Sequence, residues 1–133
     1  MRVVVDSSVL VAALIDTGAE GTWAENVLAS GALHAPELVR AEAANILRRL
    51  ELAKRITASE ASAAQGDLMQ LAIELYPFDP FANRIWELRH NVTCYDGWYV
   101  AVAEGLKLPL ATLDARLRRA KGPRCKFVSP PRP

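Results

Sequence analysis

The chain has 133 residues, of which 51% are hydrophobic and 23% are charged, and its formal net charge is +1. This composition excludes a disordered or fibrous chain and is typical of one globular domain, which we expect to span residues 1–133. No apolar run approaches the roughly 20 residues that cross a bilayer, and Asp6 interrupts any apolar core of a signal peptide. We therefore expect a cytoplasmic protein.

The first half of the chain alternates expected strands and helices. Residues 3–5 are all valine, and this β-branched run predicts a buried strand that ends at Asp6. Ser7 and Ser8 offer hydroxyls that can cap the helix that follows. Pro36 suits the first turn of a long amphipathic helix. The elements expected here are helices over about 7–15, 20–29 and 37–53 and a short strand over 33–35.

The second half continues the alternation. Thr57 and Glu60 have the spacing of a capping box, which predicts a helix to about residue 72. Residues 74–78 fit an edge strand, because Pro77 cannot donate to a β ladder. The remaining expected elements are helices over 79–90 and 93–105, a strand over 110–113, a short basic helix and a strand over 126–128. This order predicts an α/β fold with a mostly parallel sheet covered on both faces.

Two aspartates each follow an expected strand. Asp6 ends the first strand and Asp114 ends the strand over 110–113. Either residue is explained alone as a helix cap. However, Ser7 and Ser8 are available as caps, and ligands of parallel sheets bind beyond the carboxyl ends of the strands. We therefore expect both carboxylates at one edge of the domain.

Two further acids lie on expected helices. Glu42 shares a helix face with Asn45 beside small alanines, although an exposed glutamate next to Arg40 or Arg49 explains it equally well. Asp96 lies in the first turn of an apolar helix, where the helix dipole favours an acid. Thr93 can already cap that helix, which leaves the Asp96 carboxylate available for another role.

The four acids together predict a metal site. Two carboxylates about 5 Å apart repel by roughly 3 kcal/mol at an effective dielectric near 20, and no lysine or arginine accompanies these motifs at suitable positions. A hard divalent cation with oxygen ligands, Mg²⁺ or Mn²⁺, would neutralise this charge. Such a cation binds phosphates and activates water for in-line attack on phosphorus.

The sequence also contains a basic run and two cysteines. Six basic residues and no acid lie between residues 116 and 126. This run is either a solvated face or a rim that contacts nucleic-acid phosphates, for which Arg116 and Arg119 are the candidate contacts. Tyr95 and Trp98 either pack in the core or stack on a base. Cys94 and Cys125 lack the partners of a metal cluster and are expected to be small, partly buried thiols.

Four motifs, in order along the chain, resemble those of PIN-domain nucleases. They are the strand with Asp6-Ser-Ser, the segment from Pro36 through Leu38 and Glu42 to Asn45, the segment from Tyr95-Asp96 through Tyr99 to Ala103, and Leu110-Ala-Thr-Leu-Asp114. The length and coverage are similar to those of the toxin half of VapBC toxin–antitoxin pairs. The resemblance implies a three-layer α/β/α sandwich and an Mg²⁺- or Mn²⁺-dependent endoribonuclease.

The resemblance also implies roles for residues. The acidic pocket would be formed by Asp6, Glu42, Asp96 and Asp114, with Asp6, Asp96 and Asp114 as metal ligands. Ser7, Asn45 and Thr112 would support the pocket, Thr112 by hydrogen bonding and Asn45 by orienting Glu42. The implied partners are a VapB-type antitoxin whose tail covers the pocket, the RNA substrate and a second copy of the chain in a homodimer.

Two positions depart from the family's pattern. Leu117 stands where many relatives carry a further acid or amide, which puts a second metal in doubt, and Gly97 replaces a common alanine. Two rival functions stay open. A phosphoryl-receiving regulator is disfavoured because Ser7, rather than a second acid, follows Asp6. A catalytically weak or silent PIN-like module that binds RNA or a partner would bind no metal.

Overall fold

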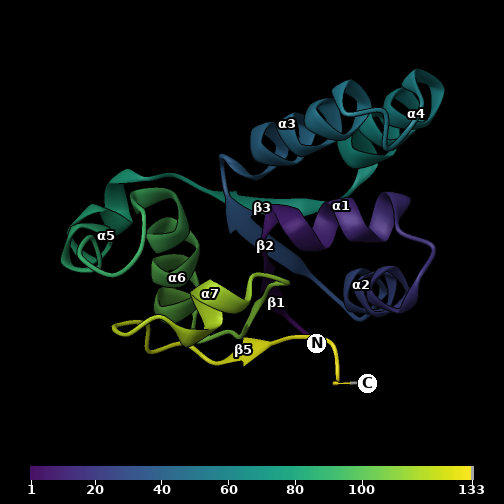
Figure 1. Cartoon of the computed structure of the whole chain (residues 1–133). Coiled ribbons are helices and arrows are strands. Elements are labelled where there is room, and N and C mark those ends of the chain that lie inside the picture. The colour runs from purple at the N-terminus through teal and green to yellow at the C-terminus, as the bar shows by residue number, and fades with distance from the viewer. Residues whose placement is uncertain (133) are drawn as a thin grey trace.

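A parallel β-sheet forms the centre of the molecule. The computed structural model describes residues 1–132, and its sheet has five strands in the order β3-β2-β1-β4-β5 (Figure 1). Every strand pairing is parallel, which confirms and sharpens the expected mostly parallel sheet. The strands are β1 (Val3–Val5), β2 (Leu33–Pro36), β3 (Ile73–Tyr76), β4 (Leu110–Ala111) and β5 (Phe127–Val128).

Helices cover both faces of this sheet. The helices are α1 (Ser7–Ile15), α2 (Ala19–Ala29), α3 (Val39–Leu52), α4 (Ala58–Gln70), the 3₁₀ turn η1 (Asp79–Phe81), α5 (Ala82–Glu87), α6 (Cys94–Leu106) and α7 (Ala115–Arg119). Helix α1 packs against α2, α3 and α4, whereas α6 packs against α5, β1, β2 and β4. Figure 1 shows these two groups on opposite sides of the sheet. The expected α/β/α sandwich is therefore confirmed. None of the helices in residues 1–132 is long and apolar enough to span a bilayer.

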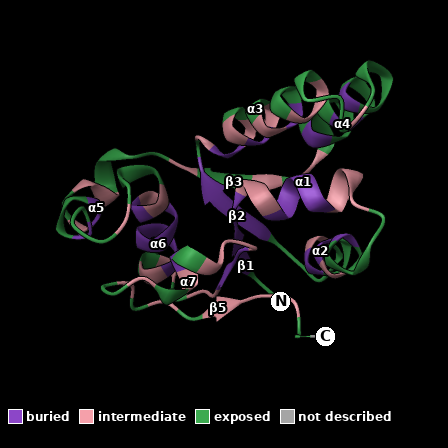
Figure 2. Cartoon of the chain, viewed as in Figure 1, coloured by how far each residue is buried: buried purple, intermediate pink, exposed green. Residues whose placement is uncertain are grey.

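The core lies around the central strands and the two helices that flank them. All three valines of β1 are completely buried, as are Val9 and Leu10 of α1 and Val100 and Val102 of α6. Figure 2 shows this burial continuing from β1 and β2 into α1 and α6. A parallel strand covered by helices on both faces has no polar side, which explains the continuous valine run.

Several expected element boundaries are wrong. Pro36 lies in β2 and not in a helical turn, and α3 begins only at Val39. The amide of Glu37 donates to the Tyr76 carbonyl at 3.0 Å, so the ladder continues past the proline that cannot donate. The strand expected over 110–113 ends at Ala111, because the next residues form the turn that caps α7.

The helix expected over 79–90 is also shorter than the sequence indicated. Residues 79–81 form a 3₁₀ turn with Pro80 in its first positions, and the α-helix that follows ends at Glu87. By contrast, the helix expected over 93–105 is formed almost as predicted. Its N-cap Thr93 accepts a hydrogen bond from the Asp96 amide, and Gly97 is buried against Ile85 and donates its amide to the Thr93 carbonyl at 2.8 Å.

The strand order places the candidate residues at one edge. The chain leaves β1 toward β2 on one side, and later returns to place β4 on the other side of β1. Ligands of open parallel sheets bind where the strand order reverses in this way, beyond the carboxyl ends of the two central strands. Asp6 follows β1 and Asp114 lies three residues after β4, so this crevice is where both carboxylates lie.

Candidate active site

Asp6 is the most buried of the candidate acids, with 7% of its surface exposed. Its Oδ1 accepts hydrogen bonds from the Ser8 hydroxyl at 2.5 Å and from the Val9 amide at 3.2 Å, so Asp6 itself is the N-cap of α1. The expectation that Ser7 or Ser8 caps this helix, and so frees the carboxylate, is wrong. Asp6 instead combines capping with a place in the crevice.

Thr112 joins Asp6 to the segment that carries Asp114. Its hydroxyl is completely buried, donates to Asp6 Oδ2 and accepts from the Asp114 amide at 3.0 Å. Ser8 forms a second link, because its hydroxyl also accepts from the Leu113 amide at 3.2 Å. The expected hydrogen-bonding role of Thr112 therefore matches its position, whereas the role of Ser8 was not anticipated from the sequence.

Asp114 is the N-cap of α7, as the helix-cap interpretation of this residue predicted. Its Oδ1 accepts from the amides of Arg116 at 2.9 Å and Leu117 at 3.3 Å. Arg116 Nε also lies 3.9 Å from Asp114 Oδ1. The expectation that no basic side chain accompanies the acids thus needs correction at this position. The Arg116 side chain is 90% exposed, however, so water and salt screen most of its charge.

Glu42 is positioned by a tyrosine. It lies in the first turn of α3, directly beyond β2, and its Oε1 accepts a hydrogen bond of 2.5 Å from the Tyr99 hydroxyl. Tyr99 comes from α6 on the other side of the sheet and is 2% exposed. Asn45, expected to orient Glu42, is exposed one turn further along α3. The spacing of Tyr99 three residues after Asp96 was the available sequence signal for its role, because it puts both on one helix face.

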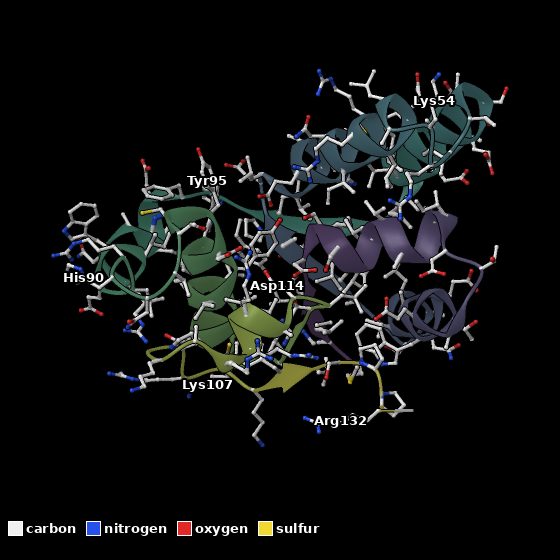
Figure 3. All side chains as sticks on the ribbon, in the orientation of Figure 1. Lys54, His90, Tyr95, Lys107, Asp114 and Arg132 are labelled. Atoms are coloured by element: carbon white, nitrogen blue, oxygen red, sulfur yellow. The ribbon has the colours of Figure 1, made fainter. Side chains whose placement is uncertain are left out.

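Asp96 is the centre of the group electrostatically. Burial raises the pKa of Asp96, and the negative charge of Asp114 raises it further. In turn, Asp96 contributes to the raised pKa of both Asp6 and Glu42. We call Asp6, Glu42, Asp96 and Asp114 the acidic cluster. Figure 3 labels Asp114 among the side chains that gather between α6, α7 and α1.

Burial has a larger effect than mutual repulsion on these carboxylates. Loss of water raises the pKa of Asp6 from its usual 3.8 to about 6, although the hydrogen bonds from Ser8, Thr112 and the Val9 amide oppose the shift. Burial likewise raises the pKa of Glu42 against the hydrogen bond from Tyr99. Burial and the neighbouring Glu42 also raise the pKa of Tyr99, which keeps its proton to donate. The fold thus holds acids whose ionisation is costly without a positive partner.

The donor set suits a divalent cation of the hard type. In the part of the chain that the structure describes, Asp6, Glu42 and Asp96 form no ion pair with lysine or arginine. Within residues 1–132, no three histidine, cysteine or acidic side chains are close enough to hold a metal ion among themselves. Mg²⁺ is normally bound through one or two carboxylates, several waters and substrate phosphates, so its binding does not require three protein ligands.

Two shallow depressions border the acidic cluster. One is lined on the α7 side by Asp96, Asp114 and Arg116, among others, and the other on the α3 side by Glu42, Asn45 and Tyr95, among others. Leu117, at the position where relatives often have an acid, is 3% exposed and packs in the hydrophobic core. It offers no oxygen ligand, in keeping with the doubt about a second metal. Arg119 is exposed on α7.

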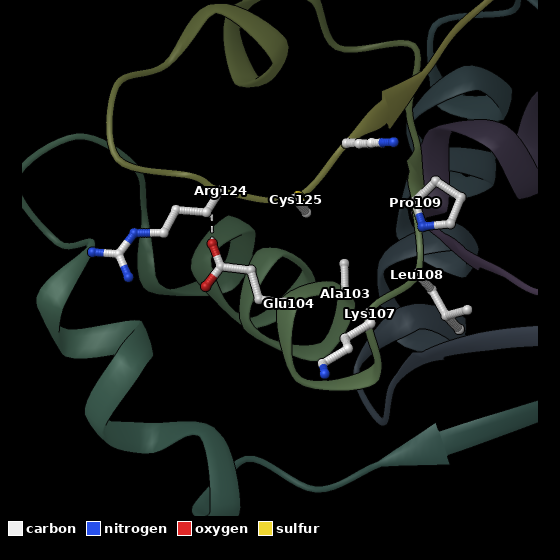
Figure 4. A pocket seen from close by; sticks show the side chains of 8 residues that line it. Ala103, Glu104, Lys107, Leu108, Pro109, Arg124 and Cys125 are labelled. Atoms are coloured by element: carbon white, nitrogen blue, oxygen red, sulfur yellow. Dashed lines mark hydrogen bonds between the residues drawn. The ribbon is translucent and has the colours of Figure 1, made fainter.

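A separate cavity lies at the other end of α6. Its walls include Glu104, Lys107, Pro109, Arg124 and Cys125 (Figure 4). Glu104 is engaged there by Arg84 Nε at 2.7 Å and by the Arg124 amide at 2.7 Å, which ties α5 and the last loop to α6. Both cysteines are free thiols; Cys125 is partly buried as expected, whereas Cys94 is exposed, so its expected burial is wrong. No member of the acidic cluster lines this cavity.

Thr112→Val should lower the free energy of unfolding by about 1–3 kcal/mol, because it leaves the Asp114 amide and an Asp6 oxygen without a partner in a buried place. Thr112→Ser keeps the hydroxyl and serves as the matched control. Urea unfolding followed by circular dichroism measures both changes. A valine variant as stable as the serine variant would show that these hydrogen bonds contribute little.

Comparison with known families agrees with this geometry. Residues 3–123 match the PIN domain model. The VapC ribonuclease Mb0985 of Mycobacterium bovis is 38% identical over 130 residues, which cover 98% of this chain and 99% of the relative. Ribonuclease VapC1 of Mycobacterium tuberculosis is 40% identical over 125 residues, covering 93% and 94% of the two chains.

A solved structure shares the fold at lower sequence identity. The crystal structure of VapBC2 from Rickettsia felis bound to a promoter DNA fragment superposes with a TM-score of 0.64 and 14% identity, covering 97% of this chain and 98% of that chain. The domain model matches most of the chain, and the two mycobacterial relatives are 38% and 40% identical over nearly its full length. The chain belongs to the PIN-domain family, within its group of VapC ribonucleases.

Proposed function

We propose that this protein is a divalent-metal-dependent endoribonuclease that acts as the toxin of a toxin–antitoxin pair. The observation that carries the proposal is the convergence of four carboxylates, three of them with a raised pKa, at the crevice where the strand order reverses. Membership of the VapC ribonuclease group supports RNA as the substrate.

Asp6, Asp96 and Asp114 would hold Mg²⁺ or Mn²⁺, directly or through water. Asp6 and Asp114 each use Oδ1 to accept backbone amides, which fixes these carboxylates in place. When bound, the cation would neutralise the cluster, polarise a phosphate of the RNA and make water a better nucleophile. Thr112 would keep Asp6 and Asp114 at a constant separation through its two hydrogen bonds.

Glu42 has the features of a proton acceptor. Burial raises its pKa above that of a free glutamate, Tyr99 donates to its Oε1, and Glu42 lines the depression on the α3 side. A raised pKa makes this carboxylate a better acceptor for a proton of the attacking water. Arg116 is exposed beside the cluster and Arg119 is exposed at the end of α7, and both would bind flanking phosphates of the substrate.

The proposed macromolecular partner is a small VapB-type antitoxin. The uncompensated charge of the acidic cluster supports this proposal, because an arginine from a partner would pair with the carboxylates that a cation otherwise neutralises. VapBC2, whose fold this chain shares, was crystallised with promoter DNA. A homodimer, which the family resemblance implies, stays a prediction.

The activity is tested by incubating the purified protein with total cellular RNA and mapping new ends by sequencing. Cleavage is expected with Mg²⁺ or Mn²⁺, is expected to stop on addition of EDTA, and should return when the metal is restored. Isothermal titration of the same metals measures binding directly. If the protein neither binds metal nor cleaves RNA, it is a silent PIN-like module. Cleavage that continues in EDTA would contradict the metal requirement.

A further inference from the structure

The two sides of the acidic cluster differ in charge and chemistry. The α7 side carries Arg116, whose guanidinium lies close to Asp114 and is almost fully exposed. The α3 side has no cation: its depression is lined by Leu38, Ala41, Glu42, Asn45 and Tyr95. Arg116 offers a phosphate a hydrogen-bonding cation on the first side, whereas, among the described residues, the only charged group that lines the second depression is the Glu42 carboxylate.

Tyr95 is the aromatic residue that lines the depression on the α3 side. It precedes Asp96 in the first turn of α6 and is 61% exposed, so its ring does not contribute to the core. Figure 3 shows Tyr95 at the N-terminal end of α6. In the described part of the chain, neither an aromatic ring nor a cation stacks on it, whereas Trp86, which is equally exposed, has Arg89 at 4.4 Å from its ring centre.

Asn45 completes a set of groups suited to a nucleobase. Its exposed side-chain amide offers both a donor and an acceptor, which is what the Watson–Crick edge of an unpaired base requires. Leu38 and Ala41 contribute apolar side chains to the lining of the depression, and Tyr95 contributes an aromatic ring. Stacking on an aromatic side chain is available to every base and does not depend on charge.

We propose that this depression, which we call the base subsite, holds the unpaired base of a nucleotide next to the phosphodiester that is cleaved. Tyr95 stacks on the base and Asn45 bonds to its edge, while the sugar–phosphate chain continues past Arg116 on the other side of the cluster. The inference rests on the proposed ribonuclease function and adds to it a requirement for a single-stranded, base-out nucleotide. Tyr95 is thus a substrate-positioning residue.

The test uses a short RNA that spans the strongest cleavage site mapped in cellular RNA, and copies in which either nucleotide beside the scissile phosphate is abasic. Wild-type protein should lose about tenfold in kcat/KM on one of the two abasic RNAs. Tyr95→Leu should lose a similar factor on the intact RNA and no more on that abasic RNA, because the stacking partner is already missing. Tyr95→Phe, which keeps the ring, should retain the wild-type rate.

Controls separate this role from a structural one. Trp86→Leu removes an equally exposed aromatic side chain from α5 and should leave all rates unchanged. Equal losses by Tyr95→Leu on intact and abasic RNA, or a change in its oligomeric state by light scattering, would overturn the base subsite while leaving the ribonuclease function intact. Failure of the wild-type protein to cleave any RNA would instead overturn the proposed function, and the base subsite with it.

Discussion

Asp96→Asn is expected to abolish metal-dependent RNA cleavage, lowering the rate by more than about 100-fold, the upper end of what loss of a supporting residue around a metal costs. The reason lies in the position of Asp96, which interacts electrostatically with each other member of the acidic cluster. Cleavage of the mapped RNA under single-turnover conditions, across a range of Mg²⁺ and Mn²⁺ concentrations, provides the measurement.

The fold should survive this substitution. The cap of α6 is made by the Thr93 hydroxyl and the Asp96 backbone amide, both of which remain in the variant. Asp67→Asn, on the exposed face of α4, makes the same chemical change away from the cluster and should cleave at the wild-type rate. If Asp96→Asn cleaves RNA at the wild-type rate and its melting temperature is unchanged, Asp96 is not part of the active site.

Asp6→Asn is expected to stabilise the protein without metal above pH 6, by up to about 3 kcal/mol in the free energy of unfolding at about 1.4 kcal/mol per pKa unit. The pKa of Asp6 is raised from 3.8 to about 6 in the folded state, chiefly by burial. The folded wild type therefore holds this proton more tightly than the unfolded chain does. Its contribution to stability is fully present below pH 3.8 and is lost as the pH rises through about 6.

Adding metal should make the wild type more stable than Asp6→Asn, which reverses the order expected without metal. At pH 8, Mg²⁺ or Mn²⁺ should raise the stability of the wild type, since a ligand that binds only the folded state adds to it, and should leave Asp6→Asn nearly unchanged. Urea unfolding between pH 4 and pH 8, with EDTA or with metal, measures both effects, and Asp67→Asn is again the control. A variant less stable than the wild type at pH 8 in EDTA would show that the Asp6 charge is compensated by groups other than a metal.

The sequence was a good guide to which residues meet at the crevice. Asp6 and Asp114 are separated by more than a hundred positions, yet parallel strands bring their carboxyl ends to one edge, and β1 and β4 are indeed neighbours. The hydrophobic valine run of β1 and the apolar helix α6 were equally readable, because burial on both sides leaves no polar position in the pattern.

The hydrogen bonds of the site were not readable in the same way. Ser7 and Ser8 were as good as Asp6 on helix-cap preference alone, and only the packed structure makes Asp6 the cap and Ser8 its donor. The link between Glu42 and Tyr99 joins residues from helices on opposite sides of the sheet. Local sequence does not specify which side chain from the other side of the sheet contacts Glu42.

Strand and helix patterns thus determined by themselves the α/β class and the sheet edge at which Asp6 and Asp114 lie, whereas the family resemblance was needed to predict that Glu42 and Asp96 belong to the same site. They did so because hydrophobic periodicity is a local property that locates each strand and helix to within a few residues, and because strands that alternate with helices predict a parallel sheet. Tertiary structure alone decided how the acids are held and how far each is buried. Those properties depend on side chains that meet across the sheet, where the loss of water and the available hydrogen bonds set the cost of each charge.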